Sequence, residues 1–461
     1  MNIDVTADAT TLADAVRTRR VGALELVDAH LARIGALNGP LNAIVTLDAE
    51  RARTRARAAD AALARGQSWG PLHGVPFTLK DAHATAGVRT TSGFPPLDHV
   101  PTDDGTVAAR LNAAGGILLG KTNVATMLGD PGQSSNPIFG RTNNPWDAAR
   151  TPGGSSGGAA AAVAAALTPF DVGTDLAGSF RIPAQFCGVY GFKPTEHRVS
   201  LAGVLPGLPP VPSVRLMSCV GPLARSVDDL ELVYSLIAGP DGRDTEVVPV
   251  PIDPVPRIEP KDLRIAFAPT LGGIPVATDI RAALERAAHA LRSAGARVEA
   301  PSLPCSDLQQ DLGSAGELIG MMTGAFQQMP GKAPQTLAQY LTALHRRDRT
   351  LLAWERFFED WDVLMCPPSL TTAFPHCETG APFAVDGRET IYWSVNAHTT
   401  LFNYTGHPAL VLPYTRDRDG LPIGVQLVAR RFGDSRLLGV ARAAAAVFGP
   451  FVSPPQSSAT R

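Results

Sequence analysis

The segment 151–167 reads TPGGSSGGAAAAVAAAL, and after TPF the chain continues as DVGTDLAGSFRIP over 171–183. The first stretch is a glycine-serine loop that runs into a helix of small residues. A helix that is apolar and small on every side must be buried against close neighbours. Residues 169–174, which lead into the second stretch, are typical of a short buried strand. Together they predict the interior of an α/β fold.

Strand and helix patterns alternate on both sides of this segment. Val75, Phe77 and Leu79 alternate as in a strand, and GILLG at 116–120 is typical of a short buried one. Helical spacing extends over 11–18, 23–37, 48–65 (which we expect to face solvent), 106–114, 228–238, 277–295 and 434–448, and further core strands are expected in LRIAFAP, WDVLMCP, PALVLPY and GVQLVAR. We therefore expect a single α/β domain with a central mixed, largely parallel twisted sheet covered by helices on both faces.

Proline-rich stretches at 204–213 and 248–260 interrupt these patterns. We expect N-terminal helices packing on the core (1–66), a core that holds the candidate site (67–240), a second strand-helix unit (241–300), a helical cap over the pocket (301–350), the C-terminal part of the core sheet (351–452) and a flexible tail (453–461).

Composition excludes several classes of function. The 461 residues include 41 basic and 43 acidic side chains, for a net charge of −2, so nothing suggests a nucleic-acid partner. No secretory signal is visible, and the longest central apolar run, 159–167, is far shorter than the ~20 residues that cross a bilayer. The five cysteines are dispersed without a CxxC pair. We expect a cytoplasmic protein without a membrane partner, a metal or a cofactor.

Three segments carry groups that could do chemistry: Lys80 after an apolar strand, the loop with Ser155 and Ser156, and DLAGS with Ser179. GGSSG matches the G-x-S-x-G nucleophile elbow, but that elbow follows a strand, and NNPWDAARTP cannot form one. A phosphate-binding loop is also excluded, because no Gly-Lys-Ser/Thr closes the glycine run.

TPGGSSGG and GTDLAGSFRIPAQFCGVYGFKPT together resemble the signature of the amidase signature family, including the 24-residue spacing of the two serines. GVPFTLKD, GKTN, VGPLARSVDD, LIAGPDGRD, FNYTGHPAL and GLPIGVQLVARRFGD resemble further segments of that family. The resemblance covers nearly the whole chain, least clearly 301–349. It implies an amidase-signature domain and a bacterial amidase.

The resemblance assigns a serine-serine-lysine arrangement to this chain. Ser179 corresponds to the nucleophile, Ser155 to the bridging serine and Lys80 to the base. The chemistry is reasonable, because a serine hydroxyl needs a base as it attacks, and a buried lysine can be neutral. A bridging hydroxyl can both donate and accept a proton.

The same resemblance places the oxyanion-stabilising N–H groups on Leu176, Ala177, Gly178 and Ser179. Relatives usually have two glycines where this chain has Ala177 and Gly178. If the first of them used a positive φ, alanine would be strained there. We therefore expect either a negative φ at Ala177 or a shifted loop.

Several neighbouring residues have structural interpretations. Ser156, Asp175 and Arg181 are expected to support the site. Asp175 and Arg181 are expected to hold the nucleophile loop, as a buried pair or through loop hydrogen bonds, and direct contact with the substrate is the less favoured alternative. Cys187 is expected to be a small buried residue rather than a nucleophile. His83 is a less favoured alternative base.

The expected activity is hydrolysis of a carboxamide through an acyl-enzyme, and the same site would suit carbamates and esters. Apolar candidates near the mouth favour a bulky or aryl amide: Leu128, Phe139, Val204, Leu205, Leu208 and Trp393. The alternative is a glutaminase that resembles the A subunit of an amidotransferase and supplies ammonia within a multi-subunit complex; a catalytically inactive scaffold is a third hypothesis. We expect a small-molecule amide as the partner and a monomer or homodimer.

Overall fold

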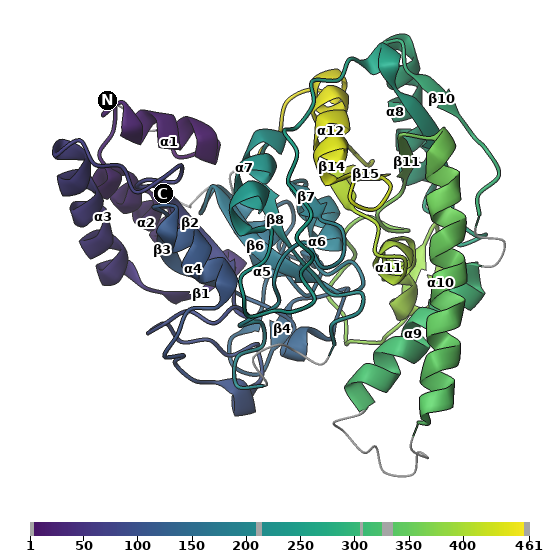
Figure 1. Cartoon of the computed structure of the whole chain (residues 1–461), viewed down its shortest axis with the longest axis horizontal. Coiled ribbons are helices and arrows are strands. Elements are labelled where there is room, and N and C mark those ends of the chain that lie inside the picture. Colours follow the sequence, from purple (N-terminus) through teal and green to yellow (C-terminus); the bar gives the residue numbers. More distant parts are fainter. Residues whose placement is uncertain (1–3, 209–213, 305–307, 325–334, 456–461) are drawn as a thin grey trace.

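The computed structural model describes residues 4–208, 214–304, 308–324 and 335–455 of the chain. Its centre is an eleven-stranded sheet with the strand order β1-β3-β2-β6-β8-β7-β14-β15-β11-β9-β10 (Figure 1). These strands are β1 (Ile44–Leu47), β2 (Pro76–Lys80), β3 (Ile117–Thr122), β6 (Phe170–Asp175), β7 (Tyr190–Lys193), β8 (Cys219–Ala224), β9 (Arg264–Phe267), β10 (Arg297–Glu299), β11 (Val363–Cys366), β14 (Ala409–Arg416) and β15 (Pro422–Val428).

Two short hairpins accompany the sheet, β4 (Ser135–Asn136) with β5 (Gly140–Arg141) and β12 (Phe383–Val385) with β13 (Arg388–Thr390). The described helices are α1 (Ala9–Arg17), α2 (Ala23–Leu41), α3 (Ala49–Ala64), α4 (Thr106–Ala113), α5 (Gly157–Ala164), α6 (Arg181–Cys187), α7 (Val227–Ile237), α8 (Thr278–Ser293), α9 (Leu308–Gly324), α10 (Leu337–Asp360), α11 (Ala397–Tyr404) and α12 (Asp434–Phe448).

The α/β class and the mixed sheet are confirmed, but the expectation of a largely parallel sheet is wrong. Among the ten strand pairings of the sheet in the described residues, only β3-β2, β2-β6, β11-β9 and β9-β10 are parallel. The other six are antiparallel. Strand direction was not readable because both faces are covered by helices, so parallel and antiparallel strands alike are continuously apolar.

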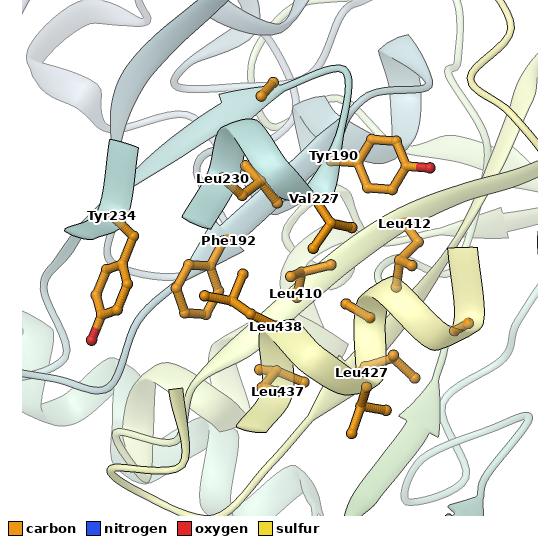
Figure 2. Close-up of a cluster of buried hydrophobic side chains, with 14 of the residues drawn as sticks. Tyr190, Phe192, Val227, Leu230, Tyr234, Leu410, Leu412, Leu427, Leu437 and Leu438 are labelled. Atoms are coloured by element: carbon orange, nitrogen blue, oxygen red, sulfur yellow. The ribbon is translucent and has the colours of Figure 1, made fainter. Parts of the chain in front are cut away.

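Helices cover both faces of the sheet. One apolar cluster joins alternate residues of β2, β6, β7, β14 and β15 to α4, α7, α8 and α12. Figure 2 shows the part of this cluster where Phe192, Leu410 and Leu427 meet Leu230 and Leu438. On the opposite face, α2, α3 and α5 pack against β1 and β3, and α6, α10 and α11 pack against β9, β11 and β15. The expected double covering is therefore confirmed.

The expected segments of the chain share this one sheet. β1 from the N-terminal segment pairs with β3, and β9 and β10 from 241–300 pair with each other beside β11. The helix expected to face solvent, α3, buries Ala52, Ala56, Ala59 and Ala62. α10 runs without interruption through residue 350, so no boundary falls there. Of the expected tail, 456–461 lie outside the described residues, as do 209–213 of the proline-rich stretch.

α9 and α10 lie side by side at one end of the molecule (Figure 1), and α9 also packs against α11. Within the described ranges, no helix combines the length and apolarity needed to cross a bilayer.

Candidate active site

β2 brings Lys80 to the site. Phe77 and Leu79 on this strand enter the apolar cluster that also contains residues of α4 and α7, so Thr78 and Lys80 project from the opposite face, which α5 covers. Every residue of β2 is buried, and the Lys80 side chain is fully inaccessible to solvent. The strand pattern therefore removes the ammonium group from water, as a lysine base requires.

The loop before α5 needs its glycines. Gly153 has a φ of +81°, and a Cβ on Gly154 would lie 2.1 Å from the carbonyl oxygen of Gln133. Any side chain at Gly154 would therefore collide with neighbouring backbone. The peptide bond between Gly154 and Ser155 is cis. The loop delivers Ser155 and Ser156 to the buried side of β2.

Three hydroxyl groups surround the Lys80 nitrogen. Nζ donates to Ser155 Oγ at 2.7 Å, to Ser156 Oγ at 2.7 Å and to Thr174 Oγ1 at 2.8 Å. An ammonium group has three protons for three acceptors, whereas a neutral amine donates two hydrogen bonds and accepts one. Since each hydroxyl can reverse its role, this shell accommodates both protonation states.

Burial makes the two states close in free energy. It lowers the pKa of Lys80 to about 7, and the carboxylates of Asp175 and Asp171 oppose that shift. A large fraction of Lys80 is therefore neutral near pH 7, and a neutral amine can accept a proton.

Ser179 lies in the turn between β6 and α6, with only 7% of its surface exposed. The Ser156 N–H donates to the Ser179 carbonyl oxygen at 2.9 Å, which ties this turn to the glycine-serine loop. Within the described part of the chain, no hydrogen bond joins Ser179 Oγ to Ser155 or Lys80. The structure thus brings Lys80 and Ser155 into direct contact and holds Ser179 in the adjoining turn through backbone.

The positive φ of the nucleophile turn falls on Gly178, not on Ala177. Gly178 has a φ of +104°, and a Cβ there would lie 2.1 Å from Thr399 Oγ1, whereas Ala177 is not among the residues with positive φ. The first expectation for this turn is therefore confirmed: alanine fits because its φ is negative.

The Gly178 N–H is occupied. It donates to Asp175 Oδ1 at 2.6 Å, so in this structure it is not free for a substrate oxygen. Among the described residues, no acceptor faces the N–H groups of Leu176, Ala177 and Ser179. Those three remain the candidate donors.

Asp175 and Arg181 form a fully buried ion pair at 3.0 Å, as expected. Burial alone would raise the pKa of Asp175, but the Arg181 guanidinium and the Gly178 N–H outweigh it and hold that pKa at about 2. Arg181 also donates to Gln426 Oε1 at 2.9 Å and to the Thr399 carbonyl at 3.0 Å. The pair therefore fastens the nucleophile turn to the C-terminal strands and helices.

Sequence reasoning missed two polar groups that hold the site. Asn403 Nδ2 on α11 donates to the Asp175 carbonyl at 2.9 Å, to its Oδ1 at 3.0 Å and to the Met217 carbonyl at 2.9 Å. Thr174, just before Asp175, is the third hydroxyl on Lys80. Asn403 lies in FNYTGHPAL, which carried part of the resemblance, but no local pattern assigns it a partner 228 residues away.

The two alternative reactive groups are buried. Burial and the charges of Lys121 and Lys80 lower the pKa of His83 to about 3, so its imidazole is too weakly basic to compete with Lys80. Cys187 is fully buried on α6, and burial raises the pKa of its thiol. A buried thiol with a raised pKa is inert, in agreement with the structural interpretation.

Comparison with known proteins gives consistent matches over most of the chain. The family model described as Amidase matches residues 25–316 and 314–438. The chain is 36% identical to the A subunit of the glutamyl-tRNA(Gln) amidotransferase of Moorella thermoacetica and 32% identical to an acylamidase of Rhodococcus erythropolis, in each case over 94% of both chains. A solved structure of 6-aminohexanoate cyclic dimer hydrolase with its substrate superposes with a TM-score of 0.83 at 29% identity, covering 98% of this chain and 99% of that one.

Proposed function

This chain belongs to the amidase family and is a hydrolase of amide C–N bonds, and on that premise we propose that it works through an acyl-enzyme on Ser179, with Ser155 and Lys80 moving the proton. The observation that carries the proposal is the fully buried Lys80 with its nitrogen 2.7 Å from Ser155 Oγ. A lysine held in this way can be neutral near pH 7 and can draw a proton through a hydroxyl.

The proposed reaction begins when Ser179 Oγ attacks the carbonyl carbon. Its proton passes to Ser155 Oγ while the Ser155 proton passes to Lys80 Nζ. The hydrogen bond between Ser179 and Ser155 must form in the substrate complex, since catalytic hydrogen bonds often tighten only there. Collapse of the tetrahedral intermediate returns the proton through Ser155 to the leaving nitrogen, and water then releases the acid by the same path.

Negative charge on the substrate oxygen would be stabilised by the N–H groups of Leu176, Ala177 and Ser179. One such donor contributes roughly 2.7–4 kcal/mol in the transition state. The engaged Gly178 N–H has a different role, because it helps the Asp175 carboxylate hold the turn.

We propose a bulky apolar or aryl amide as the substrate, with carbamates and esters accessible to the same chemistry. The Leu176 side chain packs against a cluster that contains Met217, Met321 and Met322. The last two are on α9, which supports the view that 301–350 caps the pocket. Methionines adapt to irregular apolar shapes, so such a wall suits a variable hydrophobic group.

The alternative is a glutaminase that supplies ammonia as one component of an amidotransferase complex. Its specific support is the 36% identity to the Moorella thermoacetica protein, which exceeds the identity to the acylamidase. A glutaminase would need a polar pocket for the glutamine α-amino and carboxylate groups.

A panel of aryl amides, aliphatic amides, carbamates, peptide amides and glutamine tests the proposal. We expect turnover of an aryl or bulky amide, loss of that turnover in Ser179→Ala, and covalent labelling of Ser179 by a fluorophosphonate in the wild type. Ammonia release from glutamine alone would establish the alternative instead. Absence of both turnover and labelling in the folded protein would support an inactive scaffold.

A further inference from the structure

A second carboxylate is buried on the same face of the sheet as Lys80. Asp171 lies on β6, where it pairs with Thr78 of β2 in a parallel ladder. Its neighbours Phe170 and Val172 enter the cluster on the opposite face, so the Asp171 side chain projects beneath α5. It is fully buried.

The side-chain hydrogen bonds to this carboxylate reach only one of its oxygens, and the Lys80 backbone N–H lies close enough to favour its ionised form. Asp171 Oδ2 accepts from Thr78 Oγ1 at 2.7 Å and from Thr122 Oγ1 at 3.1 Å. Oδ1 is buried without a hydrogen-bond partner in the described chain. Leaving a buried carboxylate oxygen unpaired is costly unless a nearby cation offsets its charge. The charge of Lys80, two residues beyond Thr78 on the same strand, favours the ionised form of Asp171.

A carboxylate with a purely structural role has different surroundings. Asp229, also fully buried, uses both oxygens: Oδ2 accepts from the Ala9 N–H at 2.7 Å and Oδ1 from the Thr10 N–H at 2.9 Å. It thereby fixes the start of α1. Asp171 fixes no helix or turn, and its free oxygen is on the face of the sheet that carries Lys80.

We propose that Asp171 is a positioning residue for hydrolysis, whose carboxylate stabilises the ammonium form of Lys80 and so sets the pH at which the enzyme becomes active. This inference rests on the proposed role of Lys80 as the base. Asp171 acts through Lys80 and does not touch the substrate.

The other charged groups near Lys80 are already engaged or lie across the sheet. Asp175 is paired with Arg181, and Lys121 and His83 are near the opposite face, with Asp81 as the counter-charge of Lys121. α5 contributes only glycine, alanine and valine. Burial raises the pKa of Asp171 to about 7, against the hydroxyl donors and Lys80. Asp171 and Lys80 therefore change charge over the same pH range, which couples them.

The test is the pH dependence of kcat/KM, or of the fluorophosphonate labelling rate of Ser179, in Asp171→Asn. The amide keeps the size and an acceptor for the threonine hydroxyls but removes the charge. Without the carboxylate the ammonium form of Lys80 is less stable, so the acid limb should move to lower pH by about one unit. An unmoved limb, or a limb at higher pH, overturns the inference.

Thr122→Val provides a second test if Asp171→Asn does not fold. It removes one hydrogen-bond donor to Asp171 Oδ2 and so destabilises the ionised carboxylate. The acid limb of the pH profile should therefore move to lower pH, by less than in Asp171→Asn. Asp229→Asn is the matched control: it should lower the stability of the protein and leave the acid limb of the pH profile unmoved.

Lys80→Ala separates failure of the proposed function from failure of the role of Asp171. If Lys80→Ala keeps the wild-type acid limb, the proposed function is wrong. If Lys80→Ala is inactive but Asp171→Asn leaves the acid limb unmoved, only the role of Asp171 is overturned.

Discussion

Two lysines are buried side by side in this sheet, and their surroundings differ. Lys80 ends β2 and Lys121 lies on the adjacent parallel strand β3, and both side chains are fully inaccessible to solvent. Around Lys80 are three hydroxyl groups. Lys121 Nζ donates to the His83 carbonyl oxygen and to Thr90 Oγ1, and the carboxylates of Asp81, Asp171 and Asp104 favour its charged form.

The difference lies in what the partners can do. One of the two partners of Lys121 is a carbonyl oxygen, which only accepts and cannot pass a proton to the amine, whereas all three partners of Lys80 are hydroxyls that can donate back to a neutral amine. Burial lowers both pKa values, to about 7 for Lys80 and about 8 for Lys121. Burial alone therefore does not distinguish a base from a structural cation, and the partners of the nitrogen do.

Replacing Lys80 and Lys121 in turn should give the largest difference in kcat/KM between two variants. Lys80→Ala should lower kcat/KM by about 10⁴-fold or more, because it removes the proposed acceptor of the Ser179 proton. Lys121→Met should keep kcat/KM within about tenfold and lower the melting temperature, because it leaves the His83 carbonyl and Asp81 without their cation. Amide turnover and thermal melts measure both. Equal losses of activity from the two variants would end the distinction between the lysines.

Removing different hydroxyl groups around Lys80 should lower kcat/KM by different amounts. Ser155→Ala should cost roughly 10²–10⁴ in kcat/KM, the usual contribution of a proton-transfer group. Ser156→Ala should cost roughly tenfold, because it removes one hydrogen bond to the amine but no step of the relay. Circular dichroism checks that both variants fold. Near-normal turnover in Ser155→Ala would remove that serine from the mechanism.

The smallest effect is in the pH profile. Activity needs neutral Lys80, so kcat/KM should rise as pH increases through about 7, by about tenfold between pH 6 and pH 8. Lys121→Met should show the same limb, because Lys121 takes no proton from the reaction. A profile that is flat from pH 6 to 8, or a limb that follows Lys121, would contradict the assignment of Lys80.

Much of the site was predictable because its residues lie in motifs with fixed spacing. GGSSGG and DLAGS identified Ser155, Ser156 and Ser179, and the apolar alternation before Lys80 predicted its burial. Asn403 could not be predicted, because its partner Asp175 is 228 residues away. The occupied N–H of Gly178 could not either, because it depends on how one carboxylate is turned.

The sequence alone determined the α/β class, through local patterns of burial and small residues, and the family, through motifs and their spacing; the proposed reactive groups follow from that resemblance. Only the tertiary structure decided that Lys80 and Lys121 lie on opposite faces of the sheet. A bulge in the pairing of β2 with β3 makes Phe77 oppose Leu118 but Thr78 oppose Gly120, so Lys80 pairs with Thr122 and Lys121 with Leu79. Without that shift Lys80 would pair with Lys121 on one face, since a slip of one residue moves a side chain to the other side of a sheet. Register is a property of paired strands, and one strand's residues do not encode it.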